Sequence, residues 1–364
     1  MDISDFKRVA VLGMGLMGGS FAAAAKKKIP SVSVIGFDQN PETRKRALEI
    51  GAADYMAETP EEAVSAADLT VLAVPIGGFE ALFKQIAPHL KPGAIVFDLG
   101  SVKGCVTEMS ERLLPESVQF LGGHPMTGSE KAGIEAATAT LYENAYFFLT
   151  PNATTHNDTI EIMIGFVQQL GAFPILIAPG EHDKIAARIS HIPHLAAVLL
   201  VEMVQESDYA SFAGGGFRDT TRIASGNPAM WRDIFMYNRK EMIKGIDLLE
   251  ERLKAMRSRL IQEDPYAIES ALSEAKRMRD DMPFSGSDYM PPLYDIIIDV
   301  EDKPGILGEL TTLLGEEGIN IKEIEILHAR ESEGGAVRIG LKTKEEQTTA
   351  LKALEAHHFK QKKK

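Results

Sequence analysis

The feature that most constrains the fold is a glycine-rich turn near the start of the chain. An apolar run at residues 9–12 predicts a short buried strand, and residues 21–28 predict a helix. Between them stand three glycines, Gly13, Gly15 and Gly18. In a dinucleotide site the first glycine permits a tight turn, the second lets the backbone approach a pyrophosphate, and the third lets the helix pack on the strand. The chain is therefore predicted to begin with an α/β Rossmann-type domain.

An acidic residue after the next strand adds to this signal. Residues 33–38 predict a strand that ends in Asp38, about 20 residues beyond the last glycine. A carboxylate there can bind the adenine ribose 2′-hydroxyl and repels a 2′-phosphate, so NAD is the predicted cofactor rather than NADP. A glycine-rich turn in another kind of α/β domain is the competing interpretation, which the order of strand, glycines, helix and acid disfavours. The predicted cofactor contacts are Gly13, Gly15, Leu16, Met17, Gly18, Asp38, Val74, Pro75 and Ser101.

Length and composition narrow the class of protein. The chain has 364 residues, which suggests two or three domains at about 150 residues each. Its net charge of −13 disfavours nucleic acid as a partner, and its single cysteine, Cys105, suits a reducing compartment. We find no signal-peptide pattern and no apolar run of transmembrane length. A cytoplasmic protein without a membrane partner is expected.

The pattern of elements changes twice along the chain. Apolar strands at residues 68–75, 94–101, 120–124, 146–150 and 172–177 suit a parallel sheet covered by helices on both faces. Beyond residue 180 the apolar residues recur at helical spacing, over residues 183–207, 230–263 and 265–280. The predicted organisation is an NAD-binding domain at 1–178, an all-α domain at 179–281, a linker at 282–292 and an α+β domain of βαββα order at 293–364.

Two polar residues follow predicted strands and could carry chemistry. Ser101 stands where its hydroxyl would project into the cleft, although it could equally cap the next helix. His124 lies in a glycine-rich loop, where a histidine can take up a proton near neutral pH. A lone histidine is more often structural, so position alone does not decide its role.

The helical region holds two further candidate groups. His191 and His194 are three residues apart and so share a helical face, but no third ligand at suitable spacing is evident and no metal site is predicted. A second segment combines arginines, aspartates and the only tryptophan. It forms either surface salt bridges or a site for a carboxylate, which guanidinium groups bind in bidentate geometry. Its members are Arg218, Asp219, Arg222, Trp231, Arg232 and Asp233.

Together these motifs resemble the prephenate dehydrogenase family, in the form with a C-terminal ACT domain. The resemblance rests on the nucleotide turn and four further motifs in order. They are Gly-Ser-Val-Lys at 100–103, His-Pro-Met-Thr-Gly-Ser-Glu at 124–130, Ser-His-Ile-Pro-His at 190–194 and Phe-Arg-Asp-Thr-Thr-Arg at 217–222, followed by Trp231. Thr127 replaces the alanine usual in the family, a small change that we expect to be tolerated.

The resemblance implies an all-α dimerisation domain and NAD-dependent oxidative decarboxylation of prephenate to 4-hydroxyphenylpyruvate, in L-tyrosine biosynthesis. By analogy, His124 accepts or polarises the proton of the ring 4-hydroxyl, and Ser101 hydrogen-bonds that hydroxyl or His124. Arg222 binds a substrate carboxylate, and His194 or His191 contacts the pyruvyl side chain. The resemblance also implies that Asp219 orients Arg222, that Trp231 forms part of the pocket wall and that Glu130 gates entry to the pocket.

The C-terminal segment looks like an ACT module, which in relatives binds amino acids between paired copies. Asp302, Gly305 and Asn320 match the loops of that site, and tyrosine, as the end product, is the implied inhibitor. The alternative is a dimerisation module without a ligand. Both the helical domain and the ACT module imply a homodimer or a higher homo-oligomer.

Three other functions remain as alternatives. A β-hydroxyacid dehydrogenase would need a catalytic lysine in a glycine-rich helical setting, which we do not find near Lys184. An arogenate-using or dual-specificity cyclohexadienyl dehydrogenase is much closer, since it differs only in a keto or amino group on the substrate. A sensor of NAD and amino acids without turnover is disfavoured, because it would not need both Ser101 and His124.

Overall fold

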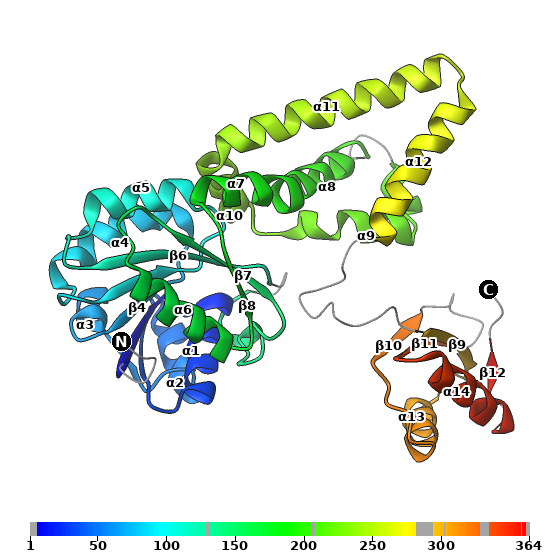
Figure 1. The fold of residues 1–364 in the computed structure, drawn as a ribbon, viewed down its shortest axis with the longest axis horizontal. Coiled ribbons are helices and arrows are strands. Elements are labelled where there is room, and N and C mark those ends of the chain that lie inside the picture. The colour runs from blue at the N-terminus through cyan, green and yellow to red at the C-terminus, as the bar shows by residue number, and fades with distance from the viewer. Residues whose placement is uncertain are drawn as a thin grey trace. The chain divides into compact units, whose positions relative to one another are not determined.

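The computed structural model describes residues 6–128, 132–204, 208–281, 294–301, 303–327, 335–357 and 359–361. The chain divides into two compact units, Met1–Gly286 and Ser287–Lys364, and each is described by itself (Figure 1). The first unit contains a large sheet and a group of helices, and the second contains a small sheet with two helices. The predicted linker at 282–292 lies outside the described residues.

The first unit is built on an eight-stranded sheet with the order β3-β2-β1-β4-β5-β6-β7-β8. Neighbouring strands are parallel except for β6 and β7, which are antiparallel. The prediction of a parallel sheet is therefore correct except at this one pair. The strands are β1 (Arg8–Leu12), β2 (Ser33–Phe37), β3 (Tyr55–Met56), β4 (Leu69–Leu72), β5 (Ile95–Asp98), β6 (Gln119–Pro125), β7 (Tyr146–Pro151) and β8 (Phe173–Leu176).

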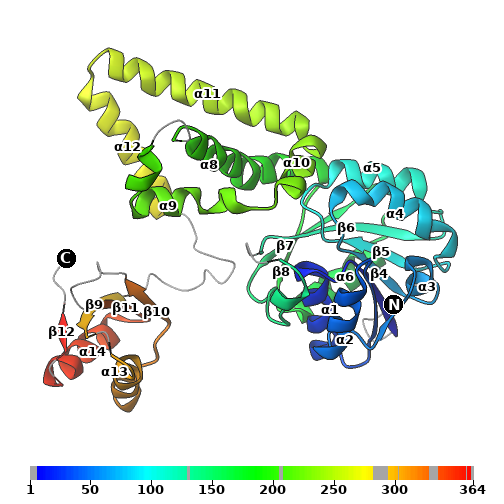
Figure 2. The same cartoon turned by 180° about the vertical axis from the view of Figure 1, so that it is seen from behind.

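Helices cover both faces of this sheet (Figures 1 and 2). One apolar layer packs under α1 and α6, where the rings of Phe21 and Phe166 stack with centroids 5.6 Å apart. The other lies under α3, α4 and α5 and includes Phe79 and Phe83. These helices are α1 (Leu16–Lys28), α2 (Pro41–Glu49), α3 (Pro60–Val64), α4 (Phe79–Ile86), α5 (Gly104–Leu113) and α6 (Asn157–Gln169). Short 3₁₀ turns lie at Ile76–Gly78, Ala87–His89 and Ile134–Ala136.

Two helices that follow strands of the sheet start differently. Asn40 caps α2, because its side chain accepts a hydrogen bond from the backbone N–H of Glu42. Ser101 does not cap the next helix, since α5 begins three residues later at Gly104 and no side chain of its N-cap residue, Lys103, closes it. A carboxylate from a distant helix fills that place, as described below.

The remaining helices of the first unit follow the sheet. They are α7 (Pro179–Ala186), the π turn η5 (Ala187–His191), α8 (Ile192–Glu202), η6 (Asp208–Phe212), α9 (Gly215–Thr221), η7 (Arg222–Ser225), α10 (Pro228–Tyr237), α11 (Arg239–Ile261) and α12 (Pro265–Asp280). Figure 2 shows α11 running along α8.

Two predicted helices of this region differ from the structure. The segment predicted at 183–207 starts at Pro179, contains a π turn and ends at Glu202. The segment predicted at 230–263 is two helices, broken at Asn238. The backbone leaves helical geometry at Asn238, with φ of −102° and ψ of 23°, and its side chain contacts Asp183 and His191.

One stretch of this region is long and apolar enough to cross a membrane by length and composition alone. It is the 24-residue stretch Pro179–Glu202, of which 28% of the most apolar window is buried. The expectation that no such run exists is therefore wrong for this helix. The signal is weak evidence of a span, because core helices pass the same test, and this helix carries buried His182 and Asp183 bonded to the sheet domain.

The second unit has an antiparallel sheet of order β10-β11-β9-β12 with a compact core that includes Ile296, Leu310 and Ile339. The predicted βαββα order is confirmed, with a short strand β12 added at the end. Its elements are β9 (Tyr294–Val300), α13 (Ile306–Glu316), β10 (Glu323–Leu327), β11 (Gly335–Leu341), α14 (Lys344–Ala356) and β12 (Lys360–Gln361).

Candidate active site

The glycine turn after β1 has a shape that only glycine permits. Gly13 has φ of +94°, and a Cβ there would lie 2.6 Å from the carbonyl oxygen of Ala73. A Cβ on Gly18 would lie 1.9 Å from the carbonyl oxygen of Gly13. Around Gly15, in contrast, no atom lies within 4 Å of an added Cβ. The turn thus combines close packing with open space over Gly15, as a pyrophosphate requires.

Strand register brings the predicted nucleotide contacts together. Leu12, the last residue of β1, pairs with Phe37 on one side and with Leu72 on the other. Asp38 therefore stands beside the turn, and its carboxylate accepts hydrogen bonds of 2.9 Å from the backbone N–H groups of Met14 and Asn40. Each carboxylate oxygen can accept a second bond, so Asp38 can hold the turn and a ribose hydroxyl together. These residues fit an NAD molecule.

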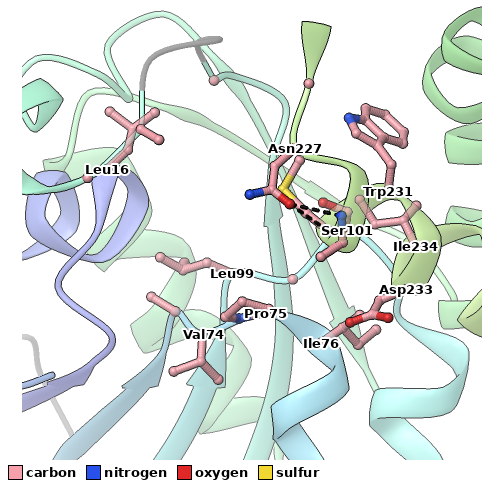
Figure 3. Close-up of a pocket in the computed structure, with 18 of the residues that line it drawn as sticks. Leu16, Val74, Pro75, Ile76, Leu99, Ser101, Asn227, Trp231, Asp233 and Ile234 are labelled. Atoms are coloured by element: carbon pink, nitrogen blue, oxygen red, sulfur yellow. Dashed lines mark hydrogen bonds between the residues drawn. The ribbon is translucent and has the colours of Figure 1, made fainter. Parts of the chain in front are cut away.

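A cavity of about 720 Å³ lies between the carboxyl edge of the sheet and the helical region (Figure 3). Ser101 and Pro75 contribute to the sheet side, whereas Arg222 and Trp231 come from the helical side. The cavity therefore joins predicted cofactor residues to predicted substrate residues. Its lining comprises Leu16, Ala73, Val74, Pro75, Ile76, Leu99, Gly100, Ser101, Gly128, Ala132, Gly133, Arg222, Ile223, Gly226, Asn227, Ala229, Met230, Trp231, Asp233 and Ile234.

Several predicted site residues lie elsewhere. His124, His191, His194 and Asp219 are not among the described residues that line the cavity. Asp219 is exposed on α9, near Arg222, whereas the three histidines are buried. Glu130 lies outside the described residues. The structure thus brings three of the eight predicted catalytic and substrate-binding residues, Ser101, Arg222 and Trp231, together in one cavity.

His194 lies directly behind the cavity wall. Its ring stacks on the indole of Trp231, with centroids 3.6 Å apart and planes at 12°. A Cβ added to Gly226, which lines the cavity, would be 2.4 Å from Nε1 of Trp231 and 3.2 Å from Cε1 of His194. The three residues therefore form one closely packed wall, in which His194 supports the surface that Trp231 presents.

A buried ion pair links the loop of Ser101 to the strand of His124. Lys103 and Asp98 are fully buried and form an ion pair. Lys103 Nζ also donates to the carbonyl oxygen of Gly123 at 2.6 Å, and Asp98 accepts bonds from the backbone N–H groups of Gly100 at 2.8 Å and Gly123 at 3.2 Å. No hydrogen bond joins the Ser101 hydroxyl to His124 among these described residues, so the two are positioned through Lys103 and Asp98.

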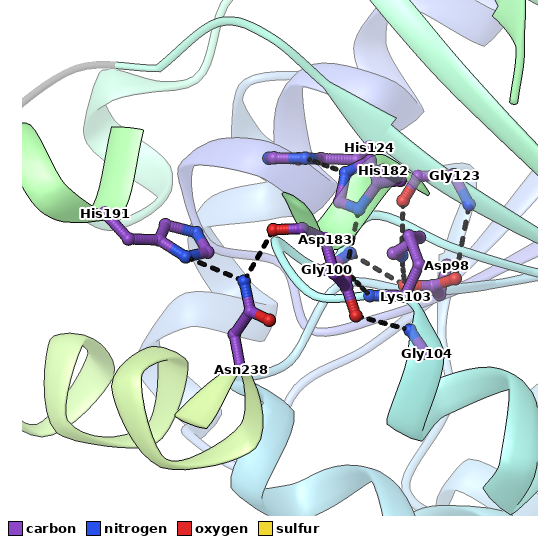
Figure 4. Close-up of polar contacts among 10 residues, drawn as sticks. All are labelled: Asp98, Gly100, Lys103, Gly104, Gly123, His124, His182, Asp183, His191 and Asn238. Carbon is purple, nitrogen blue, oxygen red and sulfur yellow. Dashed lines mark hydrogen bonds and ion pairs between the residues drawn. The ribbon is translucent and has the colours of Figure 1, made fainter. Parts of the chain in front are cut away.

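His124 has a partner that sequence reasoning missed, His182, which is bonded in turn to Asp183 (Figure 4). Nδ1 of His124 lies 2.8 Å from Nε2 of His182, whose Nδ1 lies 2.9 Å from Oδ1 of Asp183. Burial is the main cause that holds the pKa of His124 well below its usual range, and repulsion from His182, Lys103 and His191 adds to it. His124 is therefore neutral at pH 7 and able to accept a proton.

His191 is fully buried and belongs to the same set of contacts. Asn238 Nδ2 donates to the carbonyl oxygen of Asp183 at 2.9 Å and lies 3.1 Å from Nδ1 of His191. The other nitrogen of His191, Nε2, is buried without a hydrogen-bond partner among the described residues. Burial lowers the pKa of His191 to about 4. Within the described part of the chain, no group of three metal-ligating side chains is found.

Comparisons with known proteins identify the family. The prephenate dehydrogenase nucleotide-binding domain model matches residues 21–176, the prephenate dehydrogenase dimerization domain model matches 178–274, and the ACT domain model matches 294–356. The chain is 34% identical to prephenate dehydrogenase of Bacillus subtilis (strain 168), over 96% of this chain and 95% of that protein. The chain belongs to the prephenate dehydrogenase family.

Other members of the prephenate dehydrogenase family extend this comparison. The cyclohexadienyl dehydrogenase of Zymomonas mobilis is 31% identical and covers 75% of this chain and 95% of its own length. Among solved structures, prephenate dehydrogenase from Aquifex aeolicus in complex with hydroxyphenyl propionate and NAD+ is 32% identical, with a TM-score of 0.72 over 76% of this chain and 98% of that chain. The Rossmann-type, helical and ACT folds expected from the sequence are those of this family.

Proposed function

We propose that this protein is an NAD-dependent prephenate dehydrogenase, which converts prephenate to 4-hydroxyphenylpyruvate and carbon dioxide in L-tyrosine biosynthesis. The observation that carries the proposal is the cavity that extends from Leu16 and Pro75, beside the nucleotide turn, to Arg222 and Trp231. Ser101 lines the sheet side of this cavity. A cofactor and an anionic substrate can therefore meet in one cavity.

The nucleotide turn and the sheet edge hold the cofactor. Gly13, Gly15 and Gly18 shape the backbone around the pyrophosphate, and Asp38 accepts the ribose hydroxyl. Leu16, Met17, Val74 and Pro75 complete the predicted contacts. NAD held by these residues would supply the hydride acceptor for oxidation of the ring carbon that carries the hydroxyl group.

His124 acts as the general base. It takes the proton of the ring 4-hydroxyl while a hydride leaves the same carbon for the bound cofactor, so that carbon becomes a ketone. Loss of the ring carboxylate as carbon dioxide then yields an aromatic product. Its lowered pKa keeps the imidazole neutral and ready for this proton. Ser101 donates or accepts a hydrogen bond at the same hydroxyl.

Arg222 binds a carboxylate of the substrate from the opposite side of the cavity. A guanidinium group matches a carboxylate in bidentate geometry, and Arg222 lines the cavity. Trp231, supported by His194, packs against the substrate ring or side chain. The roles of His191 beside the pyruvyl group, of Asp219 in orienting Arg222 and of Glu130 in gating entry stay predictions.

The second unit provides regulation in this proposal. Gly305, at the start of α13 with φ of +91°, and Asn320 are both exposed and therefore accessible to a ligand. Asp302 lies outside the described residues. We propose tyrosine as the ligand and inhibitor, and a homodimer through the helical region as the assembly. The free Cys105 supports a cytoplasmic location.

NADH absorbance tests the reaction directly. The purified protein is mixed with NAD and prephenate, with NADP in place of NAD, and with arogenate in place of prephenate. NADH that forms with prephenate supports the proposal. NADH that forms only with arogenate would show instead that the protein is an arogenate dehydrogenase. Inhibition by tyrosine in the full chain, weakened in Asn320→Ala, supports the regulatory role; equal inhibition of both proteins would exclude that site.

A further inference from the structure

Three side chains form a hydrogen-bonded row that ends at the proposed base. His124 Nδ1 lies 2.8 Å from His182 Nε2, and His182 Nδ1 lies 2.9 Å from Asp183 Oδ1 (Figure 4). His182 is fully buried, and the other two are at most 9% exposed. The row is therefore shielded from water, and each ring nitrogen in it has one definite partner.

Asp183 is the fixed acceptor of the row. Its Oδ1 accepts a hydrogen bond from the backbone N–H of Lys103 at 2.7 Å, and its Oδ2 accepts one from Gly104 at 2.8 Å. These N–H groups stand at the N-terminus of α5, where the helix dipole favours negative charge. Both oxygens of Asp183 thus act as hydrogen-bond acceptors, and His182 must carry its proton on Nδ1 to bond to Oδ1.

The proton on His182 decides the form of His124. Burial lowers the pKa of His182, against the effect of its hydrogen bond to Asp183, so the ring is neutral and its Nε2 holds a lone pair. His124 must therefore donate from Nδ1 to make the 2.8 Å contact. Because His124 is neutral as well, its proton is on Nδ1 and its Nε2 is the basic nitrogen.

We infer that His182 and Asp183 are positioning residues that hold His124 in the Nδ1–H form, with Nε2 available to accept the substrate proton. The inference rests on the proposed role of His124 as the base. When Nε2 takes up the hydroxyl proton, the new positive charge on His124 is shared with His182 and attracted by Asp183. The row therefore both selects the reactive tautomer and stabilises the charge that forms during the step.

Other charges also act on the two histidines of the row. Lys103 and Asp98 form a buried ion pair, and for His182 Lys103 lowers the pKa whereas Asp98 raises it. His191 approaches from the π turn and, like Lys103, lowers the pKa of His124. Asp183, at the end of the row, is its acidic member and bonds directly to His182. Its loss would therefore weaken the base.

Two variants that differ by one methylene group test the row. In His182→Gln the amide reaches the former place of Nε2 and can still accept from His124. In His182→Asn the shorter amide takes the place of Nδ1, so it bonds to Asp183 but does not reach His124. We expect His182→Asn to lower kcat by about 10- to 100-fold with little change in the KM of prephenate, as orienting partners do. His182→Gln should recover most of that loss.

Side-chain nitrogen NMR gives a second readout that needs no turnover. In the full chain without substrate, the His124 signals are identified by their absence in His124→Asn. The inference predicts an Nδ1–H imidazole in the wild type and a mixture of tautomers in His182→Asn. An Nε2–H imidazole in the wild type would overturn it, as would equal kcat in both His182 variants. An Nδ1–H signal without turnover of prephenate would instead refute the proposed function and leave the tautomer assignment standing.

Discussion

The imidazole of His194 lies flat against the indole of Trp231, with ring centroids 3.6 Å apart and planes at 12°. Trp231 faces the cavity and His194 does not, so the histidine acts on the substrate surface through the tryptophan. Stacked rings at this distance restrict each other's rotation. The position of Trp231 in the cavity wall consequently depends on His194, which does not itself line the cavity.

Gly226→Ala should move that wall. The new methyl group would lie 2.4 Å from Nε1 of Trp231, so the indole or its backbone must shift. We expect a loss of about 1–3 kcal/mol in stability, as for overpacking elsewhere, and a higher KM for prephenate. Thermal unfolding and initial rates measure the two effects. Gly216→Ala is the matched control, because no atom lies within 4 Å of the added carbon; equal behaviour of the two variants would contradict the close packing.

His124→Asn should abolish most turnover and leave NAD binding intact. The amide cannot take up a proton at neutral pH, and a positioned base contributes about 10²- to 10⁴-fold to rate. Stopped-flow kinetics and NAD titration measure the two quantities. His156→Asn, at an exposed histidine remote from the site, serves as the control. Normal turnover of His124→Asn would exclude the histidine as the base.

Arg222→Ala should weaken prephenate binding more than it slows the chemical step. A hydrogen bond to a charged group contributes roughly 1.5–3 kcal/mol, which corresponds to a KM about 10- to 100-fold higher. Arg218→Ala, on the preceding helix α9 but outside the described cavity lining, should have little effect. A KM for Arg222→Ala within twofold of the wild type would remove Arg222 from the carboxylate site.

Asp38→Asn should raise the use of NADP relative to NAD. The amide oxygen can still accept from the backbone N–H of Met14, while the negative charge that repels a 2′-phosphate is lost. Arg44 donates to the carbonyl oxygen of Asp38 and so stands close enough to attract that phosphate. The ratio of kcat/KM for the two cofactors measures the change, and a ratio that stays constant would show that Asp38 does not select the cofactor.

Stability should fall on acidification through the buried His191. The unfolded chain protonates this histidine near its ordinary pKa of about 6.5, whereas the folded chain does so only near pH 4. Between these values the unfolded state binds more protons, so the free energy of unfolding decreases as pH falls, by about 3 kcal/mol. Denaturant unfolding at several pH values measures this slope. His191→Gln should show a shallower slope; an identical slope would assign the effect to other groups.

The sheet domain was largely predictable because its signals are local. The glycine turn and Asp38 each follow an apolar strand directly, and strand register then places them side by side. The antiparallel direction of β7 was not predictable in the same way. A strand buried on both faces has the same apolar composition in either direction, so nothing in residues 146–151 states which way it runs.

The substrate side was only partly predictable, for a related reason. Ser101, Arg222 and Trp231 belong to motifs, and all three line the cavity. His182 and Asp183 belong to no motif and reach His124 only through the tertiary fold. A neighbouring histidine and aspartate are common in surface helices, so the residue types carried no signal until the fold buried them.

The π turn at Ala187–His191 limits which insertions and deletions this chain can tolerate during evolution. A π turn holds one residue more than an α-helical turn, so every later residue of α8 is rotated by roughly 100° from a regular continuation. Loss of a single residue from this turn would straighten the helix and carry His194 away from Trp231. Insertions and deletions should therefore be poorly tolerated here, although the segment looks like an ordinary apolar helix.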